Sequence, residues 1–221
     1  MYLRKRFLFT IMERAENHPF ESFHYCPRCG ARFVRHNEKA YHCEGCGFVY
    51  YFNPSAATVA VIVNERNELL VCVRAKEPAK GTLDLPGGFC DMHESAEQGV
   101  AREVLEETGM RVTETKYLFS LPNTYLYSGF VVHTIDAFFL CSVPKGAMPV
   151  PHDDVAECRW VPMGEVNADD FGLDSVREGV RRIIDNSQLT IDNSAAQRRR
   201  GMKASVATTE ALASSRSVKL A

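Results

Sequence analysis

Residues 88–110 read GFCDMHESAEQGVAREVLEETGM, a run in which glycines, glutamates and one arginine alternate with apolar residues. Ser95 is suited to cap a helix, and Gln98 three residues later completes a capping box. Gly109 stands where a helix commonly ends in the left-handed conformation, which glycine adopts at little cost. The run therefore predicts a loop, a helix over 96–108 and a second loop.

Three glutamates share one side of this predicted helix. Glu103 precedes Glu106 by three residues and Glu107 by four, so the three carboxylates span about one third of the circumference. Like charges at this spacing destabilise a helix by a few tenths of a kcal/mol. Mg²⁺ or Mn²⁺ would neutralise them and would suit displacement at phosphorus. On spacing alone, a solvated acidic face with a salt bridge from Arg102 explains the cluster equally well.

The same run carries a resemblance to a known family. From Gly88 to Met110 it matches the Nudix box, GX5EX7REUXEEXGU with U aliphatic, at every defined position. The resemblance extends over about residues 53–185. It implies the Nudix fold, an α+β fold (an α/β/α sandwich) with a mixed sheet between helices. It also implies hydrolysis of a nucleoside diphosphate linked to another moiety.

The resemblance assigns roles to individual positions. It implies that Glu103, Glu106 and Glu107 are ligands of Mg²⁺ or Mn²⁺, and that Glu94 assists the site. Arg102 is expected to orient the glutamates by ion pairing, and the substrate-contacting loop is expected to be shaped by Gly87 and Gly88. Glu157 resembles a downstream carboxylate that some members use as a metal ligand or base. The alternative for Glu157 is an ordinary surface carboxylate.

The sequence around the box alternates strands and helices. Asn53-Pro54 marks a boundary, and Ala101, Val104 and Leu105 are expected to pack the predicted helix on a sheet. The β-prone runs and a second helix with apolar residues at helical spacing support a mixed sheet with helices. The predicted strands cover 56–63, 69–73, 117–121, 131–141 and 158–161, and the second helix covers 175–184.

Four of the eight cysteines form two CxxC pairs, Cys26/Cys29 and Cys43/Cys46, which predict a zinc ribbon over 24–52. The alternatives are disulfides or free buried thiols, and the lack of a convincing signal peptide argues against disulfides. The ribbon is expected to be structural, because zinc supplies folding energy to a segment too short for its own core. The other four cysteines are interpreted as small hydrophobic residues.

Composition places the chain among ordinary globular proteins. It has 221 residues, 45% of them hydrophobic and 24% charged, and a formal charge of −2, which gives no global basic field for nucleic acid. No apolar run approaches the roughly 18 residues of a membrane helix, and a cytoplasmic location is expected. Residues 1–23 are interpreted as a leader. Residues 53–185 are the Nudix domain, and the basic, Ser- and Ala-rich residues 186–221 form a predicted disordered tail.

A ribbon before a Nudix domain resembles the NADH pyrophosphatase group, which implies a dinucleotide substrate such as NAD(H) and a homodimer. That group carries SQPWPFPxS after the box, whereas residues 120–128 read SLPNTYLYS. Tyr125 and Tyr127 are candidates to stack on a base in place of the missing aromatics, or else are partly buried sheet residues. FAD and ADP-ribose, and NAD-capped RNA, stay open as substrates. A ligand sensor or nucleic-acid-binding regulator is the alternative of a different class.

Overall fold

The structure is a computed structural model that describes residues 23–127 and 130–185, with the backbone alone for 125–127 and 130. The predictions for the leader and for the tail beyond residue 185 therefore lie outside the described residues. Contacts divide the chain into two units, Met1–Arg177 and Glu178–Ala221. Within the described ranges, no helix combines the length and the apolar character that a bilayer crossing requires.

The cysteine-rich segment forms a small antiparallel sheet of its own. Strands β1 (Phe33–Arg35), β2 (Ala40–Cys43) and β3 (Val49–Tyr51) pair in the order β1-β2-β3. Its buried cluster holds only Cys26, Phe33 and Cys43, with three partly buried residues packed around them. A cluster of this size is too small to stabilise a fold by apolar burial alone.

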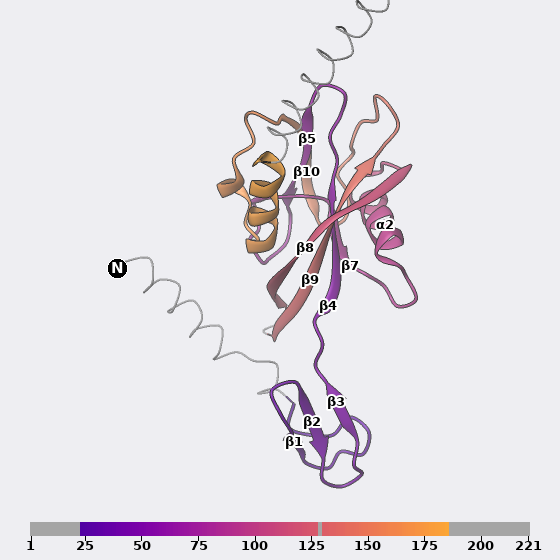
Figure 1. The fold of residues 1–221 in the computed structure, drawn as a ribbon, viewed down its shortest axis with the longest axis vertical. Helices are drawn as coiled ribbons and strands as arrows, with labels where there is room; N and C mark the ends of the chain where they lie inside the picture. Colours follow the sequence, from indigo (N-terminus) through magenta and orange to yellow (C-terminus); the bar gives the residue numbers. More distant parts are fainter. Residues whose placement is uncertain (1–22, 128–129, 186–221) are drawn as a thin grey trace, which may run out of the picture. The chain divides into compact units, whose positions relative to one another are not determined.

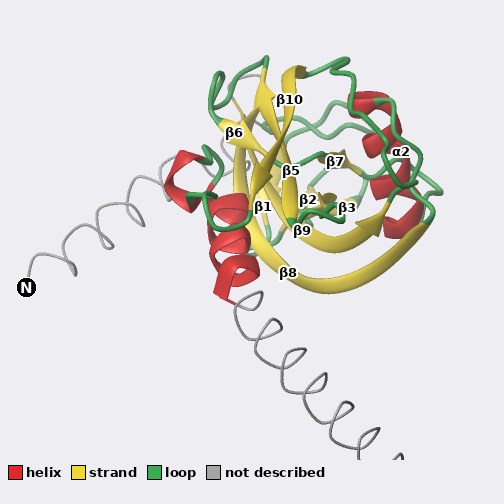
Figure 2. Ribbon diagram, turned by 90° about the horizontal axis from the view of Figure 1, so that it is seen from above, coloured by secondary structure: helices red, strands yellow, loops and turns green. Residues whose placement is uncertain are grey.

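The larger domain is built on two further sheets, with helix α2 packed beside them (Figure 1). The first sheet has the order β7-β4-β9-β8, and the second has the order β10-β5-β6. Figure 2 shows β8 and β9 as long, strongly curved strands. The elements are β4 (Ser55–Val61), β5 (Glu68–Arg74), β6 (Leu83–Asp84), β7 (Gly87–Phe89), α2 (Ala96–Thr108), β8 (Glu114–Tyr127), β9 (Phe130–Ser142), β10 (Val155–Pro162) and the 3₁₀ turn η2 (Ala168–Asp170).

The first sheet is mixed, as predicted. β4 runs parallel to β9 and antiparallel to β7, and β8 runs antiparallel to β9. Helix α2 lies against β4 and β7 (Figure 1). The core beneath it joins Val100 and Val104 of the helix to Ala60, Leu70 and Phe139 of the strands. The α+β class and the mixed sheet are thus confirmed.

Helix α2 begins and ends where the sequence places it. The Ser95 side chain accepts a hydrogen bond from the Gln98 backbone N–H, and the Gln98 side chain completes the capping box. Gly109 adopts the left-handed conformation with φ of 68°. One packing expectation was wrong: Leu105 is 43% exposed. The helix instead buries Val100 and Val104, which lie four residues apart on its core-facing side.

The opposite face of the first sheet is tied to a second helix, over residues 174–185. Side chains alternate along β9, so Asp136 points away from Phe139 and the α2 side. The buried Asp136 carboxylate accepts hydrogen bonds of 2.5 Å from Thr134 Oγ1 and from Ser175 Oγ, in the first turn of that helix. This contact fixes the start of the helix to the sheet.

Candidate functional site

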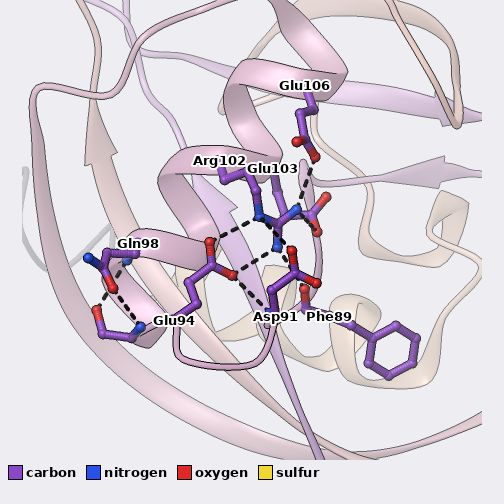
Figure 3. Close-up of polar contacts among 8 residues, drawn as sticks. Phe89, Asp91, Glu94, Gln98, Arg102, Glu103 and Glu106 are labelled. Carbon is purple, nitrogen blue, oxygen red and sulfur yellow. Dashed lines mark hydrogen bonds and ion pairs between the residues drawn. The ribbon is translucent and has the colours of Figure 1, made fainter.

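Arg102 lies at the centre of a cluster of carboxylates (Figure 3). Its Nε and Nη2 donate to the two oxygens of Glu94, each at 3.0 Å. Nη1 donates to Glu103 at 2.8 Å and to Glu106 at 3.0 Å, and Nη2 also donates to the Phe89 carbonyl at 2.9 Å. A guanidinium has five N–H donors, and carboxylate or carbonyl oxygens of the protein accept a hydrogen bond from each of them. The arrangement fixes the positions of three glutamates relative to one another.

Glu94 contacts Arg102 but, unlike Arg102, does not reach the cavity that the other carboxylates of the cluster line. The guanidinium beside it lowers the pKa of its carboxyl, and a backbone hydrogen bond from Asp91 at 2.9 Å acts in the same direction. Among the described residues that line the adjacent cavity, Glu94 does not appear. Its geometry is that of a residue that holds Arg102 in place.

The three other glutamates of the box differ in their environments. Glu106 is half exposed, Glu103 is largely buried, and Glu107 is only 9% exposed. Burial raises the pKa of Glu103, and it raises the pKa of Glu107 to about 9. In the hydrogen bonds that the described residues make, each carboxylate uses one oxygen. The other oxygen of each remains for a ligand.

Two glycines bring the β7 backbone against these carboxylates. The Gly87 N–H donates to Glu107 at 3.0 Å. A Cβ on residue 87 would lie 2.1 Å from the Thr58 carbonyl oxygen, and a Cβ on residue 88 would lie 2.6 Å from Glu103 Oε1. Contacts this short require something to move. Residue 87 therefore requires glycine against the Thr58 backbone, and a side chain on residue 88 would displace the Glu103 carboxylate.

The cluster opens into a cavity of about 370 Å³. Gly87, Gly88 and Asn123 line it, together with two guanidinium groups, Arg74 and Arg102. Arg74 is itself paired with Asp84. Among the described residues, the cavity's carboxylates come from several elements and greatly outnumber the two arginines. They are Asp84, Asp91, Glu103, Glu106, Glu107, Asp136, Asp153 and Asp154.

Comparison with known families identifies this arrangement. The model of the NUDIX domain matches residues 53–182, which is more than half of the chain and includes the whole cluster. The chain belongs to the NUDIX domain family. The Nudix fold predicted from the box is therefore confirmed.

Curated relatives of this Nudix protein include NAD-capped RNA hydrolases named NudC. The NudC of Vibrio vulnificus is 28% identical over 156 residues, which cover 69% of this chain and 57% of that protein. The NudC of Shigella flexneri is 27% identical over 142 residues, covering 64% and 52%. The chain thus spans little more than half the length of the curated relatives that it matches.

Solved structures agree on the fold. A Nudix hydrolase from Nitrosomonas europaea superposes with a TM-score of 0.58 at 23% identity, covering 74% of this chain and 91% of that one. The Nudix domain of Shewanella oneidensis NrtR, solved with ADP ribose, gives a TM-score of 0.50 at 20% identity, covering 63% and 89%. At these identities the likeness concerns the fold.

The structure does not bring every predicted residue to the Nudix site. Glu157 is exposed, lies 3.8 Å from Arg159, and is not among the described residues lining the cavity. The carboxylates downstream of the box that do line it are Asp136 and the adjacent pair Asp153 and Asp154. The acidic pair is visible in the sequence just before β10, but its spacing matches no part of the box. Asp84 and Asp136 were missed because strand residues carry no comparable signal.

Tyr125 and Tyr127 lie at the C-terminal end of β8. Their backbones pair with Val132 and Phe130 of β9, and their side chains lie outside the described residues. Asn123, two residues earlier on the strand, does line the cavity. Because the side chains of Tyr125 and Tyr127 lie outside the described residues, their predicted contact with a base stays a prediction.

The four ribbon cysteines converge on one point. Their sulfur atoms all lie within 4.8 Å of one another, with Cys26 and Cys46 at 3.8 Å and Cys29 and Cys43 at 3.5 Å. Tetrahedral zinc with bonds of about 2.3 Å holds its sulfurs about 3.8 Å apart. Backbone N–H groups also donate to the Cys26 and Cys43 sulfurs. In the described part of the chain, no other group of three or more His, Cys, Asp or Glu residues brings its ligand atoms this close together.

Proposed function

We propose that this Nudix protein hydrolyses the diphosphate linkage of a nucleoside diphosphate derivative, releasing two monophosphates. The observation that carries the proposal is the placement of Glu103, Glu106 and Glu107 on the wall of one cavity, beside Gly87 and Gly88. A cavity of about 370 Å³ is within the usual range for a small-molecule site. The NUDIX domain match and the NudC relatives support the same activity.

The donor set suits hard divalent cations. Glu103, Glu106 and Glu107 would hold Mg²⁺ or Mn²⁺ through the oxygens that Arg102 and Gly87 leave free. When bound, the cations supply Lewis-acid polarisation of a phosphoryl oxygen and a more acidic water. Arg102 positions the carboxylates of Glu103 and Glu106 through hydrogen bonds, and Glu94 positions Arg102 in the same way. The chain's own contribution is thus a fixed, pre-arranged set of oxygen ligands.

The ribbon is proposed to hold structural zinc through Cys26, Cys29, Cys43 and Cys46. The sulfur separations and the N–H groups that donate to two of the sulfurs support a four-thiolate site. A closed Cys₄ set leaves no coordination position for a substrate, so a structural role follows from the ligand count. The zinc and the catalytic cations therefore have separate donor sets, sulfur for one and oxygen for the other.

For the substrate, we favour a dinucleotide such as NAD(H). The support is the ribbon placed before the Nudix domain and the NudC relatives, which are named as NAD-capped RNA hydrolases. NAD-capped RNA shares the NAD diphosphate linkage, so it belongs to the same chemical class. ADP-ribose and FAD are the competing substrates, because residues 120–128 depart from the sequence of the NADH pyrophosphatase group.

The deciding experiment is a hydrolysis screen with the zinc-loaded full chain. NADH, NAD⁺, FAD, ADP-ribose and a short NAD-capped RNA are incubated with Mg²⁺ or Mn²⁺, and monophosphate products are quantified by chromatography. We expect metal-dependent turnover of at least one substrate and its loss, by about 10²-fold or more, in Glu106→Gln. The matched control is Arg182→Lys, which changes the exposed ion pair of Arg182 with Glu178 on the helix over 174–185. Turnover that survives Glu106→Gln would refute the site assignment.

A ligand sensor or nucleic-acid-binding regulator remains the alternative from another class. It predicts no turnover on any substrate, together with salt-dependent binding of DNA or RNA in a gel shift. The intact set of box glutamates favours the enzyme. The expected homodimer and cytoplasmic location are further proposals, which sedimentation of the purified chain and cell fractionation test.

A further inference from the structure

Two of the scattered cysteines, 86 residues apart in the sequence, meet across neighbouring strands. Cys72 of β5 and Cys158 of β10 are direct register partners in an antiparallel pair. Their sulfur atoms lie 3.6 Å apart. Cys72 is buried on the cavity wall, and Cys158 is partly exposed. The other two cysteines outside the ribbon, Cys90 and Cys141, have no such partner in the contacts of the described residues.

The strand pairing sets a backbone separation that a disulfide accepts. Directly opposed residues of antiparallel strands have Cα atoms about 4.5–5.5 Å apart. Disulfides span Cα separations of about 4.4–6.8 Å. Bond formation at about 2.05 Å then requires the two sulfurs to approach by roughly 1.5 Å, which side-chain rotation supplies without separating the strands.

We propose that Cys72 and Cys158 are a redox-active thiol pair that a hydroperoxide converts into a cross-strand disulfide. The partly exposed Cys158 is the sulfur that the oxidant reaches first, and the buried Cys72 is the sulfur that completes the bond. The contact between the two sulfur atoms lowers the pKa of Cys158, which favours its nucleophilic thiolate. The same contact, together with burial, raises the pKa of Cys72.

The chemistry balances with hydrogen peroxide as the oxidant. The Cys158 sulfur attacks one peroxide oxygen, the O–O bond breaks, and the departing hydroxide takes the thiol proton to give water and a sulfenic acid. The Cys72 sulfur then attacks the Cys158 sulfur, the S–O bond breaks, and hydroxide leaves with the Cys72 proton as a second water. The two thiols lose two electrons in total, and one peroxide is reduced to two waters.

The test uses the full chain loaded with zinc and treated with dilute hydrogen peroxide. After alkylation of free thiols, trypsin places Cys72 in peptide 67–74 and Cys158 in peptide 146–159, each with a single cysteine. We expect mass spectrometry to find these two peptides linked, with two alkylatable thiols lost and both restored by dithiothreitol. Recovery of both peptides alkylated and unlinked, or Cys158 linked to another cysteine, would overturn the proposal.

Three variants separate a pair from independent thiols. Cys72→Ala should leave Cys158 to stop at the sulfenic acid, which dimedone traps, and Cys158→Ser should leave the buried Cys72 reduced. Cys90→Ser, which changes a cysteine outside the pair, should keep the linked peptides at the wild-type yield. Oxidation of Cys72 in the Cys158→Ser chain at the wild-type rate would show that Cys158 is not the entry point. None of these readouts depends on hydrolytic activity, so the pair and the proposed function fail independently.

Discussion

The carboxylate of Glu103 occupies the space beside Gly88 in which a side chain would begin. A Cβ on residue 88 would lie 2.6 Å from Glu103 Oε1, and that oxygen is also held by Arg102 at 2.8 Å. Gly88→Ala is therefore expected to displace the carboxylate and lower kcat/KM by about 10²-fold, as misplacement by about 1 Å does in other enzymes. Steady-state kinetics with the best substrate measures this loss. Gly164→Ala, where an added Cβ meets nothing within 4 Å, should keep wild-type kinetics.

Replacing Arg102 with lysine should cost both activity and stability. Lysine keeps the charge but cannot reproduce the five-donor fork, so Glu94 and Glu103 lose charge-assisted hydrogen bonds in a largely buried setting. We expect the free energy of unfolding to fall by roughly 2 kcal/mol and kcat to fall by about 10²-fold. Urea denaturation and kinetics report the two effects. Equal unfolding midpoints for Arg102→Lys and wild type would contradict the cluster's role.

The buried Glu107 predicts an unusual dependence of stability on pH. Burial raises its pKa from 4.5 to about 9 in the folded chain. Without Mg²⁺ or Mn²⁺, the stability that comes from the protonated carboxyl is complete below pH 4.5 and is lost as the pH rises through about 9. Wild type should therefore lose stability relative to Glu107→Gln as the pH rises from 6 to 8.5, with a limiting slope of about 1.4 kcal/mol per pH unit.

Thermal unfolding of both chains at several pH values, without added divalent cations, measures that difference. Glutamine is neutral throughout and keeps an oxygen for the Gly87 N–H, so the variant isolates the proton. Added Mg²⁺ should restore wild-type stability at pH 8.5 while leaving Glu107→Gln nearly unchanged. If the unfolding temperatures of wild type and Glu107→Gln changed with pH by the same amount, Glu107 would be ionised in the folded protein.

Asp136 is expected to matter for stability through its two hydroxyl donors. Asp136→Ala leaves the buried Thr134 and Ser175 hydroxyls without this acceptor, and we expect a loss of about 3 kcal/mol. The same change made in a Ser175→Ala background should cost less, because one of the two hydroxyls is already gone. A double-mutant cycle followed by urea denaturation measures the coupling. Strict additivity would mean that the sheet and the helix over 174–185 are not joined through this contact.

Removing one ribbon thiolate should release zinc. Cys26→Ser is expected to lower the zinc content from about one per chain to nearly none. It should also make the ribbon susceptible to proteolysis, because its buried cluster is small. Metal analysis and limited trypsin digestion report the two outcomes. Cys90→Ser, outside the cluster, is the control. A variant with full zinc content and unchanged digestion would exclude the four-cysteine site.

Local signals predicted the parts of the fold that are built locally. The capping box at Ser95 and the left-handed Gly109 follow from residue types at fixed spacing, and both are present. The β-prone runs located β4, β5, β9 and β10 to within a few residues. Strand β7 was missed because its Gly87-Gly88 pair has little β propensity; its pairing with β4 depends on close backbone approach instead.

Contacts between distant residues could not be read from the chain. Nothing in the sequence pairs Cys72 with Cys158, which meet only because β5 and β10 are neighbours in register. The exposure of Leu105 could not be predicted for the same reason. Helical spacing shows which residues share a face of the helix, whereas the position of the sheet decides how much of that face is buried. The role of a residue such as Glu157 depends on where its strand points, which spacing does not encode.

The full engagement of Arg102 has a kinetic consequence. All five of its N–H groups are taken by the protein, and Arg74 is paired with Asp84. Among the described residues that line the carboxylate-rich cavity, no guanidinium is therefore left uncommitted to attract a diphosphate. A polyanion approaching it without cations meets net repulsion. Under the proposed function, we therefore expect metal to bind before the nucleotide or together with it, and not after it. Rates at fixed nucleotide should follow the concentration of the metal–nucleotide complex or of free cation.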